Sequence, residues 1–266
     1  MSTHTFSLAD DLALALKIAD AADLITQSRY QSQDLVITTK PDNTPVTDAD
    51  KATETAIRAI LTKERPDDGV LGEEFGESDI LGSRYWVIDP IDGTKNFMRA
   101  VPTWSTLIAL VEDGEVVVGV VSAPALTRRW HASKGDGAYV CFNSGAPRKI
   151  AVSKVSQIKD ASLTYSDFVG FGERKDAFIS LIDQSWRSRG FGDFWSHMLV
   201  AEGSADIAVE PVLAVWDMAA LDIIVREAGG SFTSITGEPG PHHGSGLSTN
   251  GILLDQVVTH LNDNAH

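Results

Sequence analysis

The sequence has very little cysteine and comparatively little positive charge. Its 266 residues include a single cysteine, Cys141, so a disulfide framework and a thiolate metal cluster are both excluded. Lysine and arginine total 22 against 37 aspartate and glutamate residues, which gives a formal net charge of −15. Because a nucleic-acid backbone is held by clustered lysine and arginine, this balance argues against nucleic acid as a partner.

Long apolar segments are also missing. Residues 1–5 lack a basic region followed by an apolar one, so they do not resemble a signal peptide. No apolar run reaches the length of a membrane span, and we expect no membrane partner. Together with the single free cysteine, these features predict a cytoplasmic protein. Its hydrophobic content of 43% is that of an ordinary globular chain, long enough to bury a substantial core.

The first half of the chain predicts helices followed by a run of strands. Residues 7–10 and 47–50 each have the form of a capping box before an apolar helical pattern, so helices are expected to about Tyr30 and to Pro66. Expected strands cover residues 35–39, 70–71, 85–88, 104–111, 115–122, 129–133 and 137–142. Asp113-Gly114 is typical of a hairpin turn. This order indicates an α+β fold.

The second half alternates strands and helices. Strands are expected at residues 162–165, 205–209 and 231–235, and helices at 173–186, 193–201, 216–229 and 253–261. Residues 237–246, rich in glycine, proline and histidine, are expected to form a loop. A division near residues 153–160 would separate an N-terminal half, 1–155, from a C-terminal half, 156–266, within one compact unit.

Residues 85–97 join an apolar strand to two aspartates and a helix start. Asp89-Pro90 is expected to end the strand, because proline has no N–H to continue a ladder. Asp92 follows in a turn, and Gly93-Thr94 opens a short helix. Carboxylate oxygens bind hard cations, and backbone N–H groups at a helix start bind phosphate. The stretch therefore predicts a cation and an anion held side by side.

Other carboxylates stand at similar places, namely Glu73-Glu74 after a short strand and Asp217 at a helix start. Taken alone, Asp92 suits a turn and Asp217 suits a helix N-cap. If these groups converge in a dry site, their repulsion requires either bound cations or raised pKa values. Oxygen ligands without cysteine or histidine favour Mg²⁺ or Mn²⁺ over Zn²⁺.

The blocks Gly72-Glu73-Glu74, residues 89–94 (Asp-Pro-Ile-Asp-Gly-Thr) and residues 216–220 (Trp-Asp-Met-Ala-Ala) resemble the signature of the inositol monophosphatase superfamily. The similarity runs from about Leu12 to Asn250. Within the superfamily the chain is most similar to bacterial, especially actinobacterial, histidinol-phosphate phosphatases. That narrower similarity lies in residues 89–97, 121–126, 192–194 and 249–251. The resemblance implies a layered α-β-α-β-α sandwich and a homodimer.

The resemblance also implies roles for individual residues. It implies that two to three Mg²⁺ ions, or Mn²⁺, are bound by the main-chain carbonyl of Ile91 and by the carboxylates of Glu73, Asp89, Asp92 and Asp217. Glu73 and Thr94 would orient a metal-bound water for in-line attack on phosphorus, with Asp92 also catalytic. The N–H groups of Gly93 and Thr94 would hold the phosphate. Asp50 is either the capping-box acid of its helix or a support for a third metal, and the two roles are compatible.

Substrate selection is expected to depend on groups beyond the phosphate. Asp193, Glu210, Asn250 and Asp217 are the candidates, and Asp193-Phe194-Trp195 departs from the small residues of polyol-phosphate members. The expected reaction is Mg²⁺-dependent hydrolysis of L-histidinol phosphate, a small-molecule phosphate ester, to L-histidinol and phosphate. The alternatives are an inositol-1-phosphate or broad polyol monophosphatase, and an inactive metal-binding regulatory protein.

Overall fold

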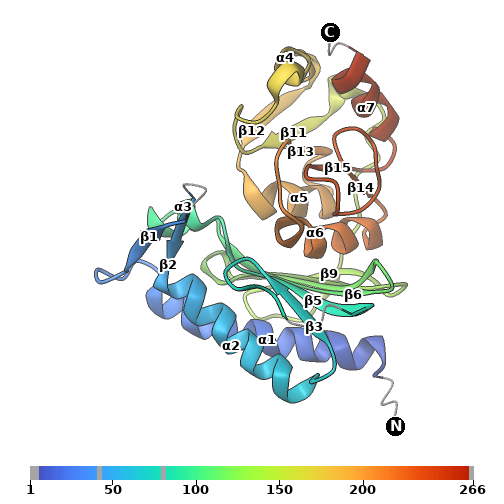
Figure 1. Ribbon diagram of the computed structural model, residues 1–266. Helices are drawn as coiled ribbons and strands as arrows, with labels where there is room; N and C mark the ends of the chain where they lie inside the picture. Colours follow the sequence, from blue (N-terminus) through green and yellow to red (C-terminus); the bar gives the residue numbers. More distant parts are fainter. Residues whose placement is uncertain (1–5, 41–43, 79–81, 264–266) are drawn as a thin grey trace.

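The computed structural model describes residues 6–40, 44–78 and 82–263, which form alternating layers of helices and sheets (Figure 1). Helices α1 and α2 cover one face of a large sheet, α5 and α6 lie between this sheet and a smaller one, and α4 and α7 cover the outside. The expected α-β-α-β-α sandwich is confirmed. The helices are α1 (Leu8–Arg29), α2 (Asp48–Glu64), α3 (Thr94–Met98), α4 (Lys175–Gln184), α5 (Asp193–Ala201), α6 (Val215–Glu227) and α7 (Leu254–Asp263).

The large sheet has the strand order β10-β9-β8-β7-β6-β5-β3-β4. Its neighbouring strands are antiparallel except β3 and β5, which run parallel. A separate hairpin of β1 (Ile37–Thr39) and β2 (Pro45–Thr47) lies beside α2 and α3. The strands of the large sheet are β3 (Gly69–Gly72), β4 (Gly76–Glu77), β5 (Arg84–Asp92), β6 (Ser105–Glu112), β7 (Glu115–Ala123), β8 (Arg128–Ser133), β9 (Gly137–Phe142) and β10 (Arg148–Lys149).

The smaller sheet has the order β12-β11-β13-β15-β14, and β11 pairs in parallel with both β12 and β13. Two of its strands were not expected. The edge strand β12 is polar and mostly exposed, and β15 lies at the end of the predicted glycine-rich loop. The expected division at residues 155–156 lies in the connection between the two sheets. The strands are β11 (Ser162–Tyr165), β12 (Arg187–Gly190), β13 (Ile207–Glu210), β14 (Ser231–Thr233) and β15 (Gly246–Thr249).

Alternating side chains of β5 fill two separate cores. Trp86 and Ile88 pack with α1 on one face of the large sheet, while Val87 faces α6 on the other. Successive side chains of a strand point to opposite faces, so one apolar run serves both layers. Helix α6 approaches the sheet very closely at Gly119, where a Cβ would lie 2.5 Å from the Cγ2 of Ile223. This close packing brings the N-terminus of α6 to the large sheet.

The predicted capping boxes at both N-terminal helices are confirmed. Ser7 and Asp10 exchange hydrogen bonds at the start of α1, as Thr47 and Asp50 do at α2. Among the described residues, the helices include none long and apolar enough to cross a membrane.

Candidate active site

Parallel pairing of β3 with β5 brings the first two carboxylates together. Gly72 pairs with Ile88, and the N–H of Glu73 donates to the Ile88 carbonyl oxygen at 3.1 Å. Glu73 is therefore beside Asp89, although the two residues are separated by a loop and a strand. Register between strands distant in sequence is set by tertiary packing, so the sequence alone could not give this contact.

Strand β5 does not end at Asp89-Pro90, and that expectation is wrong. The strand continues to Asp92, with an irregularity in its pairing with β6. Asp89 pairs with Leu107 and Asp92 with Ser105, so three steps on β5 face two on β6. This bulge accommodates the proline, whose carbonyl oxygen accepts a hydrogen bond from the Thr106 hydroxyl at 2.8 Å.

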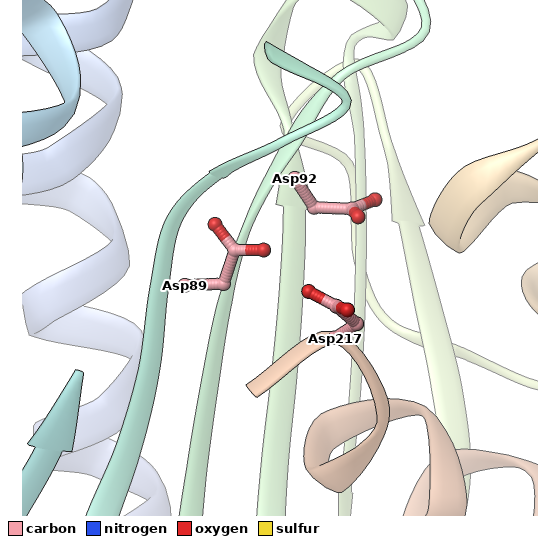
Figure 2. A group of neighbouring side chains, drawn as sticks. All are labelled: Asp89, Asp92 and Asp217. Atoms are coloured by element: carbon pink, nitrogen blue, oxygen red, sulfur yellow. The ribbon is translucent and has the colours of Figure 1, made fainter. Parts of the chain in front are cut away.

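The bulge also determines where the two aspartates point. In a regular strand, residues three apart face opposite sides of the sheet. The extra residue shifts the alternation, and Asp89 and Asp92 turn toward the same site (Figure 2). Asp89 accepts from the Ile91 N–H at 3.0 Å, and Asp92 accepts from the Phe194 N–H at 2.9 Å at the start of α5.

Asp217 completes the group from the first turn of α6. Its Oδ2 accepts from the Ala214 N–H at 2.8 Å, so it is a capping carboxylate as well as a site residue. One carboxylate oxygen from each of Asp89, Asp92 and Asp217 lies within 4.8 Å of the others, and Figure 2 shows the three side chains directed toward one another.

The electrostatics of this group call for a cation. Burial, followed by the neighbouring carboxylates, raises the pKa of both Asp89 and Asp92 well above their usual range. Burial also raises the pKa of Asp217 to about 7, with Glu73 adding to the effect. Ionising several such carboxylates together requires compensating positive charge. The donors are oxygen atoms, which fit Mg²⁺ or Mn²⁺.

Lys40 forms ion pairs with two glutamates at the site, Glu73 and Glu74. Its Nζ lies 2.7 Å from Oε1 of both Glu73 and Glu74. Burial disfavours the charge of Lys40, but its hydrogen bonds to these two carboxylates raise its pKa. Burial raises the pKa of Glu74 to about 7, although Lys40 opposes this shift. The sequence alone could not reveal these contacts, because the position of the hairpin of β1 and β2 depends on tertiary packing.

Glu54 is a supporting residue that sequence reasoning did not identify. Fully buried on α2, it accepts from the Glu74 N–H at 2.8 Å and from Arg58 Nε at 2.8 Å. It thereby fixes the turn that carries Glu73. Gly72 leaves the space for it, since a Cβ there would lie 2.1 Å from Glu54 Oε1. The available signal was the i, i+4 pair of Glu54 with Arg58 on an otherwise amphipathic helix.

Asp50 and Thr94 meet beside the candidate metal ligands Asp89, Asp92 and Asp217. Asp50 closes the capping box with Thr47, and its Oδ1 lies 3.4 Å from the Thr94 hydroxyl. Thr94 also lies 3.0 Å from the Ile91 carbonyl oxygen, to which its hydroxyl can donate. Burial raises the pKa of Asp50 to about 6. Asp50 therefore has its capping role and also lies near the site.

Asp193 and Glu210 lie near the group of Asp89, Asp92 and Asp217, close enough to act on it electrostatically. Asp193, at the start of α5, accepts from Asn96 Nδ2 at 2.9 Å, and burial raises its pKa to about 6. Its Oδ2 would lie 3.1 Å from a Cβ on Gly93, so it is adjacent to the expected phosphate-binding turn. Glu210 ends β13 and accepts a hydrogen bond from the Ser166 hydroxyl. Burial raises the pKa of Glu210 to about 8, with Asp193 contributing.

Asn250 lies apart from this group, and its expected contact with substrate stays a prediction. Its Nδ2 donates to Ser153 Oγ at 3.0 Å and to the Val155 carbonyl at 2.7 Å. Its Oδ1 accepts from the N–H groups of Ile252 and Leu253. Both amide protons are therefore used to hold the connection between the two sheets.

The sheet register also separates Asn250 from Glu210. Its N–H donates to the Asp206 carbonyl, at the opposite end of β13 from Glu210. Four residues of strand place these ends roughly 13 Å apart. Spacing in the sequence could not reveal this, because β15 was not expected and its antiparallel pairing with β13 decides where Asn250 lies.

The fold and the site together define a family. The family model described as "Inositol monophosphatase family" matches residues 8–265, and the chain belongs to this family. A solved inositol monophosphatase from Zymomonas mobilis has a TM-score of 0.85 and 32% sequence identity, and the match covers 97% of this chain and 99% of that one.

Two curated relatives are more similar in sequence. A histidinol-phosphatase from Mycobacterium tuberculosis is 55% identical over 255 residues, covering 95% of this chain and 98% of that protein. A histidinol-phosphatase from Streptomyces coelicolor is 52% identical over 259 residues, covering 95% of this chain and 97% of that protein.

Proposed function

We propose that the protein is a Mg²⁺-dependent phosphatase that hydrolyses L-histidinol phosphate to L-histidinol and phosphate. The observation that carries the proposal is the convergence of Asp89, Asp92 and Asp217, whose oxygens lie within 4.8 Å of one another. The substrate is supported by the two histidinol-phosphatases that are 55% and 52% identical over most of the chain. It is also supported by Asp193 and Glu210 beside the metal-binding carboxylates.

The buried oxygen donors fit a hard divalent cation. Two to three Mg²⁺ ions, or Mn²⁺, would be held by the Ile91 carbonyl and by the carboxylates of Glu73, Asp89, Asp92 and Asp217. Asp50 would support the outermost ion through water. When bound, such ions lower the pKa of a coordinated water and neutralise charge on the phosphoryl oxygens.

The residues around the cations would align the reactants. The Glu73 carboxylate would accept a hydrogen bond from the attacking water. The Thr94 hydroxyl would form the second hydrogen bond with the same water. Asp92, anchored by the Phe194 N–H, would hold its oxygens steady beside the phosphate. The N–H groups of Gly93 and Thr94 would donate to phosphate oxygens. Gly93 suits this turn because its φ is +80° and a Cβ would lie 2.9 Å from the Thr103 carbonyl oxygen.

The outer carboxylates would bind the remainder of the substrate. Histidinol phosphate carries a primary ammonium and an imidazole, and both form charge-assisted hydrogen bonds with carboxylates. Glu210 and Asp193 would accept these hydrogen bonds, and Asp217 would contact the substrate as well as a metal ion. A polyol ester has no positive charge to stabilise the ionised form of a buried glutamate.

The test is phosphate release by purified protein with Mg²⁺, comparing L-histidinol phosphate with inositol 1-phosphate. We expect the larger kcat/KM for histidinol phosphate. Faster release from inositol 1-phosphate would instead support a polyol monophosphatase and refute the proposed substrate.

A matched pair of variants tests whether the site is catalytic. Glu73→Gln is expected to lower kcat by orders of magnitude without loss of fold, whereas Glu77→Gln, at an exposed position on β4, keeps its activity. Retention of full activity in Glu73→Gln would contradict the assigned role. Absence of turnover in the unaltered protein would favour a metal-binding regulatory protein.

We also propose that the enzyme acts in the cytoplasm as a homodimer, as the sequence resemblance implies. Light scattering across a concentration series measures the oligomeric state, and a monomer at all concentrations would contradict the homodimer.

A further inference from the structure

The parallel part of the smaller sheet delivers three carboxylates to one place. Strands β12, β11 and β13 run side by side in the same direction, with Tyr165 paired to Gly190 and to Val209. Each strand ends at, or just before, an acidic residue: Asp193 after β12, Asp167 after β11 and Glu210 at the end of β13. The carboxyl ends of parallel strands meet at one edge of a sheet, where ligands commonly bind.

Close backbone contact holds these three segments together. A Cβ on Gly192 would lie 3.2 Å from the Cβ of Ser166 and 3.3 Å from its Cα, so the turn before Asp193 packs directly on the turn before Asp167. The Ser166 hydroxyl donates to Glu210 Oε2. Ser166 thus contacts both neighbouring segments, and Asp167 follows it immediately on the exposed side.

One buried atom at this edge has an unused acceptor. Glu210 is 4% exposed, and its Oε1 is buried without a hydrogen-bond donor among residues 6–40, 44–78 and 82–263. A buried acceptor without a donor lowers the stability of the folded protein, and a ligand that supplies the donor removes this cost. Asp193 and Asp167 both act electrostatically on Glu210, and Lys95 offsets part of the negative charge at Asp193. The group therefore favours a positively charged ligand.

We propose that Asp167 is a specificity-determining residue that, with Asp193 and Glu210, selects phosphate esters carrying an ammonium group over neutral polyol phosphates. The inference rests on the proposed phosphatase function and adds a residue that neither the sequence motifs nor the metal-binding group indicated. Glu210 supplies the buried acceptor, and exposed Asp167 supplies negative charge where the cationic end of the substrate enters.

The test is the isosteric variant Asp167→Asn. Asp167 Oδ1 accepts from the Val169 N–H at 2.6 Å, and the asparagine carbonyl can accept the same bond, so the turn is retained. The matched control is Asp183→Asn, which removes the same charge from an exposed position on α4. That end of α4 leads into the start of β12. Asp183 therefore lies near the N-terminal ends of the parallel strands, whereas Asp167 lies at their C-terminal ends.

The measured quantity is the ratio of kcat/KM for L-histidinol phosphate to kcat/KM for inositol 1-phosphate. We expect Asp167→Asn to lower this ratio roughly threefold to tenfold, mainly through KM for histidinol phosphate, with a smaller effect at high salt. Asp183→Asn should leave the ratio at its original value. An unchanged ratio in Asp167→Asn, or an equal loss on both substrates, would overturn the inference.

The test of Asp167 can fail or succeed independently of the test of the proposed substrate. The unaltered protein's own preference between the two esters decides the substrate, whereas the change of ratio on substitution decides the role of Asp167. The dissociation constant of L-histidinol, measured by calorimetry with Mg²⁺ present, gives a readout without turnover. It should rise in Asp167→Asn by a similar factor, and equal binding by both proteins would contradict the inference.

Discussion

Replacing Glu210 with glutamine should change how the stability of the metal-free protein depends on pH. Burial raises the pKa of Glu210 to about 8 from its usual value of 4.5, so the folded protein holds a proton that the unfolded chain releases. Because the folded-state pKa of an acid is raised, stability is fully present below the usual value and is lost as pH rises toward 8. Glutamine does not ionise, so the stability of the variant should not show this decrease with rising pH.

The magnitude follows from the size of the shift. Each pH unit between the two pKa values costs the unaltered protein about 1.4 kcal/mol. Between pH 5.5 and pH 7.5 the variant should therefore gain up to about 2.7 kcal/mol relative to the unaltered protein. The glutamine NH₂ group replaces Oε1 at a buried position, which adds a pH-independent cost of about 1–3 kcal/mol. The slope with pH, rather than stability at one pH, is the diagnostic quantity.

Urea unfolding in the presence of EDTA at pH 5.5, 6.5 and 7.5 measures this slope. Glu173→Gln, at an exposed position in the turn Gly172–Arg174, is the control, and its stability difference should not vary with pH. A Glu210→Gln difference that is equally independent of pH would refute the reasoning, because Glu210 would then ionise alike in the folded and unfolded chain.

Two further predictions concern the candidate metal ligands and the turn beside them. Mg²⁺ should raise the melting temperature more at pH 8 than at pH 5.5, because the raised pKa values of Asp89 and Asp217 keep these ligands protonated in acid. Thermal scans with and without Mg²⁺ test this, and equal shifts at both pH values would contradict it. Gly72→Ala should cost about 1–3 kcal/mol of stability, because its Cβ would lie 2.1 Å from Glu54 Oε1. It should also lower kcat by displacing Glu73, whereas Gly82→Ala, with open space around its Cβ, should do neither.

Local signals made much of the fold predictable. The capping boxes at Ser7 and Thr47 form between residues three positions apart, so the sequence contains all the information they need. The hairpin at Asp113-Gly114 is equally local, and its strands lie within a residue or two of the expected bounds. The long apolar strands of the large sheet were recognisable for the same reason.

Features that depend on distant pairing could not be predicted. The bulge in β5 needs β6 as its reference, and without it Pro90 indicates a strand end. Lys40 reaches Glu73 only because the β1–β2 hairpin lies against the site, and Asn250 is separated from Glu210 by the register of β15 on β13. For the candidate metal ligands, the resemblance to a family supplied what periodicity and spacing could not.

In the proposed function, metal binding and substrate selection depend on different sheets. The candidate metal ligands Asp89, Asp92 and Asp217 come from β5 and from the first turn of α6, and α6 is fixed to the large sheet through its close contact at Gly119. The carboxylates proposed to select the substrate come from the ends of β11 and β13 and from the turn after β12. Substitutions in the segments that follow these strands can therefore change which ester is accepted while leaving the metal-binding group in place. Loops carried on a rigid scaffold allow this kind of variation. The proposed function would also explain how so acidic a chain can bind a phosphate ester. Mg²⁺ would offset the charge of Asp89, Asp92 and Asp217, and the ammonium group of the substrate would offset that of Asp167, Asp193 and Glu210.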